Sequence, residues 1–100
     1  TTNYLAAISD FTKNISINPN NAEAFYNRGL ARSKLNNKLG AIDDFTEAIR
    51  LKPDMSCAYM NRGNLKHSLL DNQCGCSDWK KAFSLGCKEA RIMLKENCNY

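Results

Sequence analysis

The chain repeats its own sequence at an interval of 34 residues, and this repeat constrains the fold more than any other feature. The letters AFYNRG at residues 24–29 return as AYMNRG at residues 58–63. The same shift places AISDFTKNISINPN at residues 7–20 over AIDDFTEAIRLKPD at residues 41–54. Repeats with a period of about 20 to 50 residues are typical of supersecondary units that stack on one another. The sequence therefore predicts a periodic array whose units cannot bury their apolar faces alone.

Each unit has the pattern of two helices joined by short turns. Apolar residues recur at three- and four-residue steps over residues 38–51, which predicts an amphipathic helix. Residues 22–35 form the preceding predicted helix, and Asn20 and Asn21 stand before it, where either can cap its exposed amides. Residues 36–37 interrupt the pattern, and Pro53 ends the second helix because proline cannot continue one. The predicted unit is a helix, a turn, a second helix and a turn marked by proline.

Small residues recur in step with aromatic ones where the helices of a unit would meet. A glycine inside a helix costs roughly 1 kcal/mol relative to alanine, so its return at the same phase favours a packing role. Without a Cβ atom it lets a second helix approach closely. We therefore expect one small–large pattern to set the interhelical distance in both units. Its members are Gly29 and Gly63 in the first helices, Ala41 and Gly75 in the second helices, and Phe45 and Trp79 four residues later.

This combination of period and residues resembles the tetratricopeptide repeat family. The resemblance implies an all-α fold, a right-handed α-solenoid of antiparallel helix pairs, in a single domain over residues 1–100. The chain departs from the family pattern where Arg28 and Arg62 replace leucine. The matching residues are Phe25, Gly29, Ala41, Phe45, Ala48 and Pro53 in one repeat, Tyr59, Gly63, Gly75, Trp79 and Ala82 in the next, and Ala7, Phe11 and Pro19 before them.

The register of the repeat divides the domain into segments. Residues 1–19 correspond to the second helix of a truncated repeat, residues 22–55 and 56–87 to two repeats, and residues 88–97 to a C-terminal capping helix. The tail Asn97–Tyr100 is expected to fray, as chain ends commonly do. A first helix without its repeat partner is expected to leave apolar surface exposed.

The family resemblance also implies a function, because the concave surface of such an array holds segments of partner proteins. The chain is therefore predicted to be a scaffold that binds a protein or peptide partner, with no cofactor and no catalytic residue. Asparagine amides can pair with a peptide backbone, and tyrosine and methionine offer adaptable contact area. The predicted groove residues are Tyr26, Asn27, Leu30 and Lys34 on one helix, and Met60, Asn61, Asn64 and His67 on the next.

Some members of this family clamp the C-terminal carboxylate of a peptide between lysine and asparagine side chains. In such a clamp, the residues that the second and third repeats contribute align with Asn61, Arg91 and Lys95 of this chain. Tyr26 and Leu30 stand where the first repeat should supply lysine and asparagine. Because the set is incomplete, binding of an unspecified partner segment is the preferred interpretation.

Self-association is the alternative function. The first helix carries Tyr4, Leu5 and Ile8 near its start. An array edge with apolar surface of this kind usually docks against another repeat or another subunit. This alternative predicts a homo-oligomer that forms through the N-terminal edge.

Charge and hydropathy argue against two other classes of protein. The net charge is only +4, whereas nucleic-acid-binding proteins usually cluster many basic residues on one face. No apolar run approaches the roughly 18 residues of a membrane span. The chain is therefore predicted to bind neither nucleic acid nor the bilayer core.

The five cysteines also limit the chemistry. An odd number argues against a complete disulfide framework, so reduced thiols in a cytoplasmic setting are expected. Cys76 is interpreted as a small core residue. His67, Cys74 and Cys76 do not have the spacing of zinc ligands, so no metal is predicted. Cys57 and His67 lack a third group that would orient a nucleophile, so no enzymatic activity is predicted.

Overall fold

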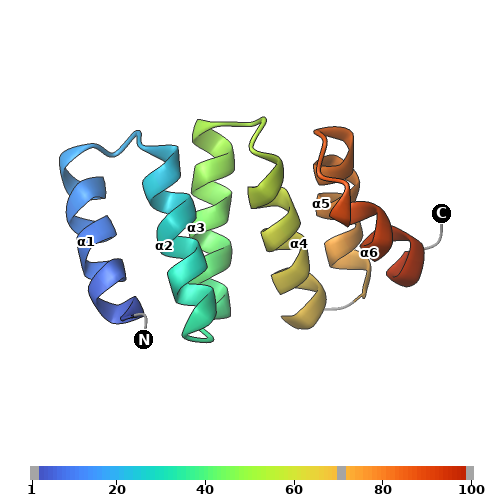
Figure 1. Ribbon diagram of the computed structural model, residues 1–100, viewed down its shortest axis with the longest axis horizontal. Coiled ribbons are helices and arrows are strands. Elements are labelled where there is room, and N and C mark those ends of the chain that lie inside the picture. The colour runs from blue at the N-terminus through green and yellow to red at the C-terminus, as the bar shows by residue number, and fades with distance from the viewer. Residues whose placement is uncertain (1–2, 70–71, 99–100) are drawn as a thin grey trace. The chain divides into compact units, whose positions relative to one another are not determined.

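The computed structural model describes residues 3–69 and 72–98, without the side chains of residues 72–74. These residues form six helices and no strand (Figure 1). They group into unit 1 (Thr1–Pro53), with the first three helices, and unit 2 (Asp54–Tyr100), with the other three. None of the described helices is long and apolar enough to cross a bilayer. The helices are α1 (Tyr4–Ile17), α2 (Ala22–Lys34), α3 (Lys38–Leu51), α4 (Ser56–Leu69), α5 (Asn72–Ser84) and α6 (Glu89–Asn97).

An asparagine precedes each helix of unit 1. The side-chain oxygens of Asn3, Asn21 and Asn37 accept hydrogen bonds at 3.1, 3.2 and 3.1 Å from backbone N–H groups three residues later. Each bond satisfies one of the amides that a helix start leaves without a partner. Between α2 and α3, Asn36 has φ 63°, in the left-handed region that asparagine tolerates better than most residues. The predicted interruption of the helical pattern is therefore a tight turn followed by a cap.

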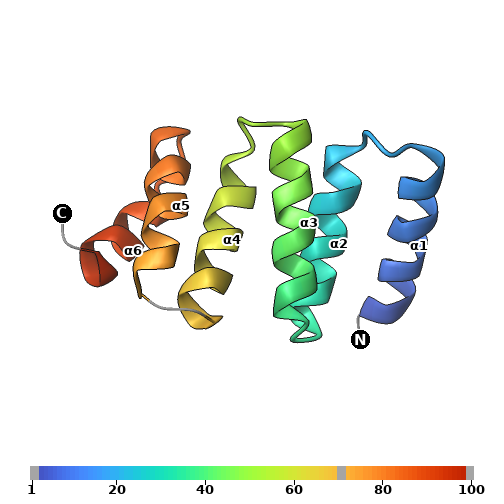
Figure 2. The ribbon, with the colours of Figure 1, turned by 180° about the vertical axis from the view of Figure 1, so that it is seen from behind.

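In unit 1, α2 packs against both α1 and α3, as two opposite views show (Figures 1 and 2). Ala41 and Phe45 of α3 are 0% exposed. A Cβ atom on Gly29 of α2 would lie 2.9 Å from Cε1 of Phe45, closer than real Cβ atoms come to a ring. The predicted packing role of Gly29 is confirmed, because only a residue without Cβ lets α3 approach this closely.

Unit 2 repeats the arrangement with a larger ring. Trp79 of α5 is 0% exposed, and a Cβ atom on Gly63 of α4 would lie 2.8 Å from its Cδ1. A Cβ atom on Gly75 would lie 2.7 Å from the backbone oxygen of Gly63 and 3.2 Å from Cη2 of Trp79. Where unit 1 has Ala41 and Phe45, unit 2 has a smaller residue beside a larger ring. The predicted small–large pattern is therefore present in both units.

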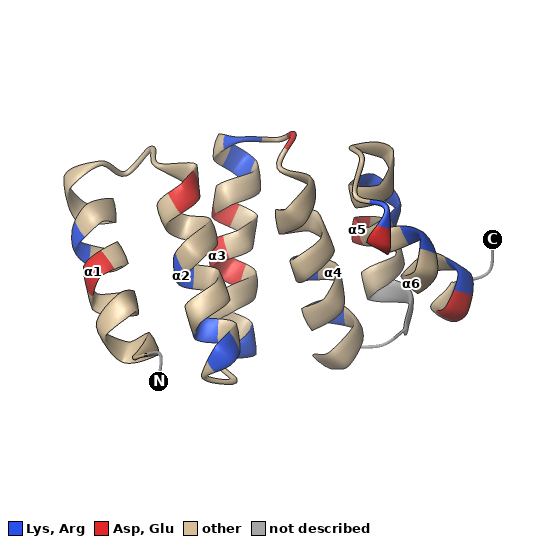
Figure 3. Cartoon of the chain, in the orientation of Figure 1, with Lys and Arg blue, Asp and Glu red and all other residues tan. Residues whose placement is uncertain are grey.

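A buried carboxylate links the central helix pair of each unit. Asp44 of α3 is 2% exposed and accepts hydrogen bonds from Arg28 and Arg32 of α2. In unit 2, Asp78 is 4% exposed and accepts two hydrogen bonds from Arg62, both at 2.8 Å. Figure 3 shows the acidic residues of α3 gathered in the middle of that helix, with basic residues towards its ends. The arginines that replace leucine of the repeat pattern thus bind carboxylates inside a helix pair, a pairing that sequence reasoning missed.

The last helix completes the core of unit 2. Ala90 of α6 is 0% exposed and belongs to one cluster with Trp79 and Ala82 of α5. Met93 and Leu94 of α6 pack against this cluster. The apolar side of α6 therefore covers the side of α5 that carries Trp79.

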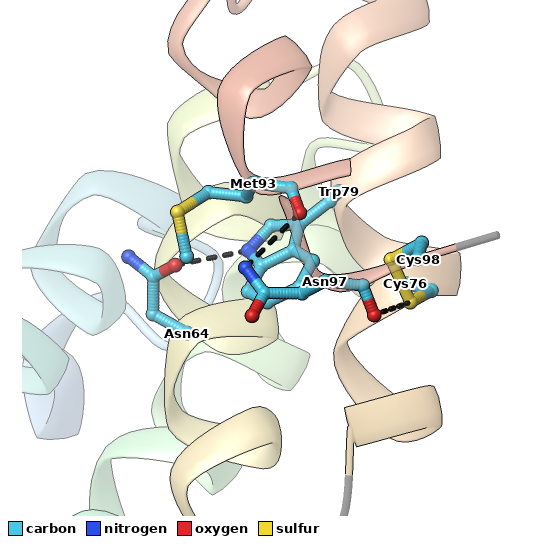
Figure 4. The surroundings of a disulfide bond; sticks show 6 residues. All are labelled: Asn64, Cys76, Trp79, Met93, Asn97 and Cys98. Atoms are coloured by element: carbon cyan, nitrogen blue, oxygen red, sulfur yellow. Dashed lines mark hydrogen bonds between the residues drawn. A yellow bond between two sulfur atoms is a disulfide. The ribbon is translucent and has the colours of Figure 1, made fainter. Parts of the chain in front are cut away.

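A disulfide bond joins Cys76 of α5 to Cys98, directly after α6 (Figure 4). The expectation of reduced thiols is wrong for this pair, because α6 folds back and brings the two Cα atoms to 6.0 Å, within the range of a disulfide. Cys76 is half-buried and cross-linked, and not a free core residue. The approach of two residues 22 positions apart depends on helix packing, which cysteine spacing does not reveal.

The expected fraying of the C-terminal tail is also wrong where the structure describes it. Asn97 belongs to α6, and its Nδ2 donates a hydrogen bond to the carbonyl oxygen of Met93 at 3.1 Å. The backbone N–H of Cys98 donates to the carbonyl oxygen of Leu94 at 3.0 Å. Residues 99–100 of the predicted tail lie outside the described residues. The disulfide and these two bonds hold the end of α6 in place.

Candidate partner-binding surface

On α2, the predicted binding residues divide into two kinds. Asn27 and Lys34 are exposed. Tyr26 and Leu30 are half-buried, and the Tyr26 ring lies 5.5 Å from the Phe45 ring, centroid to centroid. Packing on Phe45 limits the motion of the tyrosine ring, which lowers the entropy lost when a ligand contacts it. The surface of α2 thus offers one braced aromatic ring and two free polar side chains.

On α4, three of the four predicted residues gather around Trp79. Met60 packs against the cluster that contains Trp79. The Oδ1 atom of Asn64 accepts a hydrogen bond from the indole Nε1 of Trp79 at 2.9 Å, and the His67 ring lies 5.1 Å from the indole ring. The fourth residue, Asn61, donates from Nδ2 to the carbonyl oxygen of Cys57 at 2.9 Å, one helical turn back.

Sequence reasoning did not identify Trp79 as the residue that organises this surface. A signal was present in the repeat: Phe45 and Leu30 of unit 1 align with Trp79 and Asn64 of unit 2 at the 34-residue shift. An apolar pair is thus replaced by a pair that can form a hydrogen bond. His67 Nδ1 is buried and has no hydrogen-bond partner among the described residues, and its ring packs against the same indole.

The arginine beside this surface is held by an acidic partner. Arg62 of α4 bonds to Asp78, and this hydrogen bond is the main reason why the pKa of Arg62 lies above its ordinary value. Lys66 Nζ also approaches Asp78, at 3.8 Å. The side chains of Arg62 and Lys66 therefore both face Asp78, a carboxylate of their own unit.

The residues of the partial clamp lie on α4 and α6 of unit 2. Asn61 is half-buried, and Arg91 and Lys95 are exposed. The two basic residues are spaced by four positions and share one face of α6 with Lys88. Unit 2 therefore carries an exposed basic stripe on its last helix.

The residues predicted for self-association lie on α1. Tyr4 and Ile8 are half-buried, whereas Leu5 is 71% exposed. None of the residues of α1 is fully buried. Self-association through this helix stays a prediction.

Two free thiols are described in unit 2. Cys57 is exposed, whereas Cys87 is half-buried and its Sγ lies 3.4 Å from Glu89 Oε2. Burial, together with the hydrogen bond to Glu89, raises the pKa of the Cys87 thiol. His67, Cys74 and Cys76 were predicted not to bind a metal. The Cys74 side chain lies outside the described residues, and Cys76 is in the disulfide. Among the described residues, no three His, Cys, Asp or Glu side chains group as metal ligands do.

Comparison with known proteins shows what this chain is similar to. The model of the tetratricopeptide repeat matches residues 22–55. The first TPR domain of Spaghetti (RPAP3), bound to the HSP90 peptide SRMEEVD, is similar with a TM-score of 0.87 and 26% identity, over 93% of this chain and 75% of that one. Residues 22–55 of this chain therefore match a tetratricopeptide repeat (TPR), and the fold of the chain is similar to that of solved TPR domains. The all-α fold of helix pairs expected from the sequence is thereby confirmed.

Two further TPR structures are similar to this chain. The Arabidopsis OM64 TPR domain has a TM-score of 0.86 and 28% identity, over 92% of this chain and 78% of that one. The second TPR domain of human RPAP3, in complex with the HSP70 peptide SGPTIEEVD, has a TM-score of 0.85 and 29% identity, over 93% of this chain and 79% of that one. Comparison with curated proteins gives no match. The division of this chain into individual repeat segments stays a prediction.

Proposed function

We propose that this chain binds a peptide segment of a partner protein through exposed side chains of its helices. One observation carries the proposal. Two of the similar TPR structures hold a peptide, SRMEEVD of HSP90 in one and SGPTIEEVD of HSP70 in the other, at TM-scores of 0.87 and 0.85. A fold of that kind presents helix faces on which an extended segment can lie.

The partner segment is an acidic one. Both peptides in the similar structures end in the letters EEVD, so each carries several carboxylates close to its end. In this chain, the exposed cations include Lys34 of α2, Lys88 directly before α6, and Arg91 and Lys95 of α6. Exposed cations on the binding module raise the rate at which an anionic segment is captured and favour it over a basic one.

Fluorescence anisotropy with labelled SRMEEVD tests the proposal. Saturable binding that unlabelled peptide reverses is the expected result. Replacing both Arg91 and Lys95 by alanine is expected to weaken binding about three- to tenfold, because exposed charges contribute modestly at an interface. Lys81→Ala on α5 is the matched control, since it also removes an exposed positive charge. Absence of saturable binding to both SRMEEVD and SGPTIEEVD would contradict the proposal.

A C-terminal amide of the same peptide separates two forms of binding. If Asn61, Arg91 and Lys95 take the terminal carboxylate, the amide binds more weakly than the acid, and the difference disappears in the Arg91→Ala/Lys95→Ala chain. If the segment is held along its length instead, the acid and the amide bind alike.

A further inference from the structure

The hydrogen bond between Trp79 and Asn64 fixes which way the Asn64 amide faces. Trp79 is 0% exposed, and its Nε1 lies 2.9 Å from Oδ1 of Asn64. An indole N–H only donates a hydrogen bond, so the amide oxygen and not the amide nitrogen must face it. Figure 4 shows the nitrogen of Asn64 on the side away from the indole. Asn64 is exposed, and its Nδ2 forms no hydrogen bond with the described residues. Two N–H donors therefore point outward from α4.

The corresponding place in unit 1 has no such donor. The 34-residue shift aligns Asn64 with Leu30 and Trp79 with Phe45. A phenyl ring has no N–H to satisfy, and leucine has no amide to orient. The two positions therefore change together between the repeats, from an apolar pair to a hydrogen-bonded pair. The oriented amide belongs to unit 2 and is not a general feature of the repeat.

The indole that orients Asn64 is itself held on several sides. Cβ atoms on Gly63 and Gly75 would lie 2.8 Å from its Cδ1 and 3.2 Å from its Cη2, so the backbones of α4 and α5 pack closely against it at these glycines. The His67 ring lies 5.1 Å from it, and Met93 of α6 packs against its cluster. Because a rigid group supports the amide, little orientational freedom is lost when a ligand binds there.

We propose that Trp79 is a positioning residue that fixes the Asn64 amide with both donors outward, so that this point of α4 takes an oxygen acceptor of the bound segment. The acceptor is a carboxylate or a carbonyl oxygen. The inference rests on the proposed function and deepens it, because it names the chemical group of the partner that unit 2 recognises. Asn64 does more than satisfy the buried indole, since its exposed nitrogen is the part that meets the ligand.

Three variants separate the two roles of Asn64. Asn64→Asp keeps an oxygen acceptor for the indole but removes the outward donors. Trp79→Phe keeps Asn64 but removes the bond that orients it. Asn64→Leu combined with Trp79→Phe reproduces the Leu30 and Phe45 pair of unit 1, so it removes the donors without leaving the indole N–H unsatisfied. The indole N–H resonance and its hydrogen exchange show whether the bond to residue 64 persists in the parent and in Asn64→Asp.

Binding of SRMEEVD is then measured by anisotropy at low salt and at about 0.5 M salt, where repulsion between separated charges is screened. Asn64→Asp is expected to retain a slowly exchanging indole N–H and the thermal midpoint of the parent, yet to bind about tenfold more weakly at both salt concentrations. The double variant Asn64→Leu/Trp79→Phe should bind SRMEEVD more weakly by a similar factor. Trp79→Phe should bind SRMEEVD about threefold more weakly although Asn64 is still present. If the indole only filled space in the core, this substitution would leave the peptide affinity of the folded chain unchanged.

The outcomes distinguish this inference from the proposed function. If the parent binds the peptide and Asn64→Asp binds it equally well with its indole bond intact, the inference is overturned and the proposed function stands. If the parent binds neither SRMEEVD nor SGPTIEEVD, both are overturned. If amidation of the peptide and Asn64→Asp weaken binding non-additively, the acceptor is the terminal carboxylate; if their effects add, it is another oxygen of the segment. Either of these last results supports the inference.

Discussion

Arg28 and Asp44 lie 16 residues apart and are joined by two hydrogen bonds, from Nε to Oδ2 at 3.0 Å and from Nη2 to Oδ1 at 2.7 Å. Arg62 and Asp78 repeat this contact at the same separation in unit 2. Two parallel bonds between a guanidinium and a carboxylate fix the orientation of one group relative to the other. Each pair therefore sets the position of one helix along its neighbour, in addition to neutralising charge between them.

Removal of the Asp44 carboxylate is expected to destabilise the chain. In Asp44→Leu, the Arg28 side chain, only 13% exposed, keeps its charge without its partner. Breaking a buried ion pair in this way should lower the free energy of unfolding by about 3 kcal/mol. Urea denaturation followed by far-UV circular dichroism measures the change. Asp43→Asn, at the exposed neighbouring carboxylate, should stay within about 0.5 kcal/mol of the parent. If the Asp44→Leu chain is as stable as the parent, the ion pair between Arg28 and Asp44 does not stabilise the fold.

A methyl group at residue 75 is expected to disturb the contact between α4 and α5. In Gly75→Ala the new atom would lie 2.7 Å from the backbone oxygen of Gly63, which cannot rotate away. Overpacking of this kind costs about 1–3 kcal/mol. Adding Trp79→Phe rebuilds the Ala41 and Phe45 pair of unit 1 and should restore part of the loss. Thermal unfolding of both single variants and of the double variant gives the coupling between the two positions; strictly additive effects would mean that ring size and the glycine are independent.

The disulfide is expected to stabilise unit 2. Cys76 and Cys98 close a loop of 22 positions, for which loss of chain entropy in the unfolded state gives about 3 kcal/mol. A phosphine reductant should therefore lower the thermal midpoint and speed hydrogen exchange in α6. Cys98→Ser should show the same change without reductant, whereas Cys57→Ser, at an exposed free thiol, should behave as the parent. Equal midpoints with and without reductant would show that packing alone holds α6.

The Cys87 thiol is expected to react slowly with alkylating agents. Burial and the hydrogen bond to Glu89 raise its pKa, so at any pH below that pKa a smaller fraction is present as the reactive thiolate. Iodoacetamide at pH 8, followed by peptide mapping, should label Cys87 more slowly than it labels glutathione, and the rate should rise only at higher pH. Glu89→Gln removes the neighbouring charge and should speed the reaction. Labelling of Cys87 as fast as glutathione would contradict the raised pKa.

Local patterns in the sequence were enough to predict the helices and much of their packing. Asn21, the break at residues 36–37 and Pro53 act within a few residues of where they stand, and the 34-residue repeat shows which positions share a role. The pairing of Gly29 with Phe45 was likewise predictable, because a glycine inside a helix is unfavourable unless another element needs the space. The predicted partner-binding residues came from the family resemblance, and their role stays a prediction.

Only the tertiary structure decided which distant side chains meet. Asp43 and Asp44 are adjacent carboxylates in the sequence, yet one is exposed and the other lies between two arginines. Cys76 meets Cys98, and Trp79 meets Asn64, because of how α6 and α4 lie on α5. Helical periodicity and capping depend on neighbours within about four residues and can therefore be predicted from the sequence. Contacts between helices depend on the distance and the angle between the helix axes. These are set by how all the side chains between the helices pack together, which no local pattern reveals.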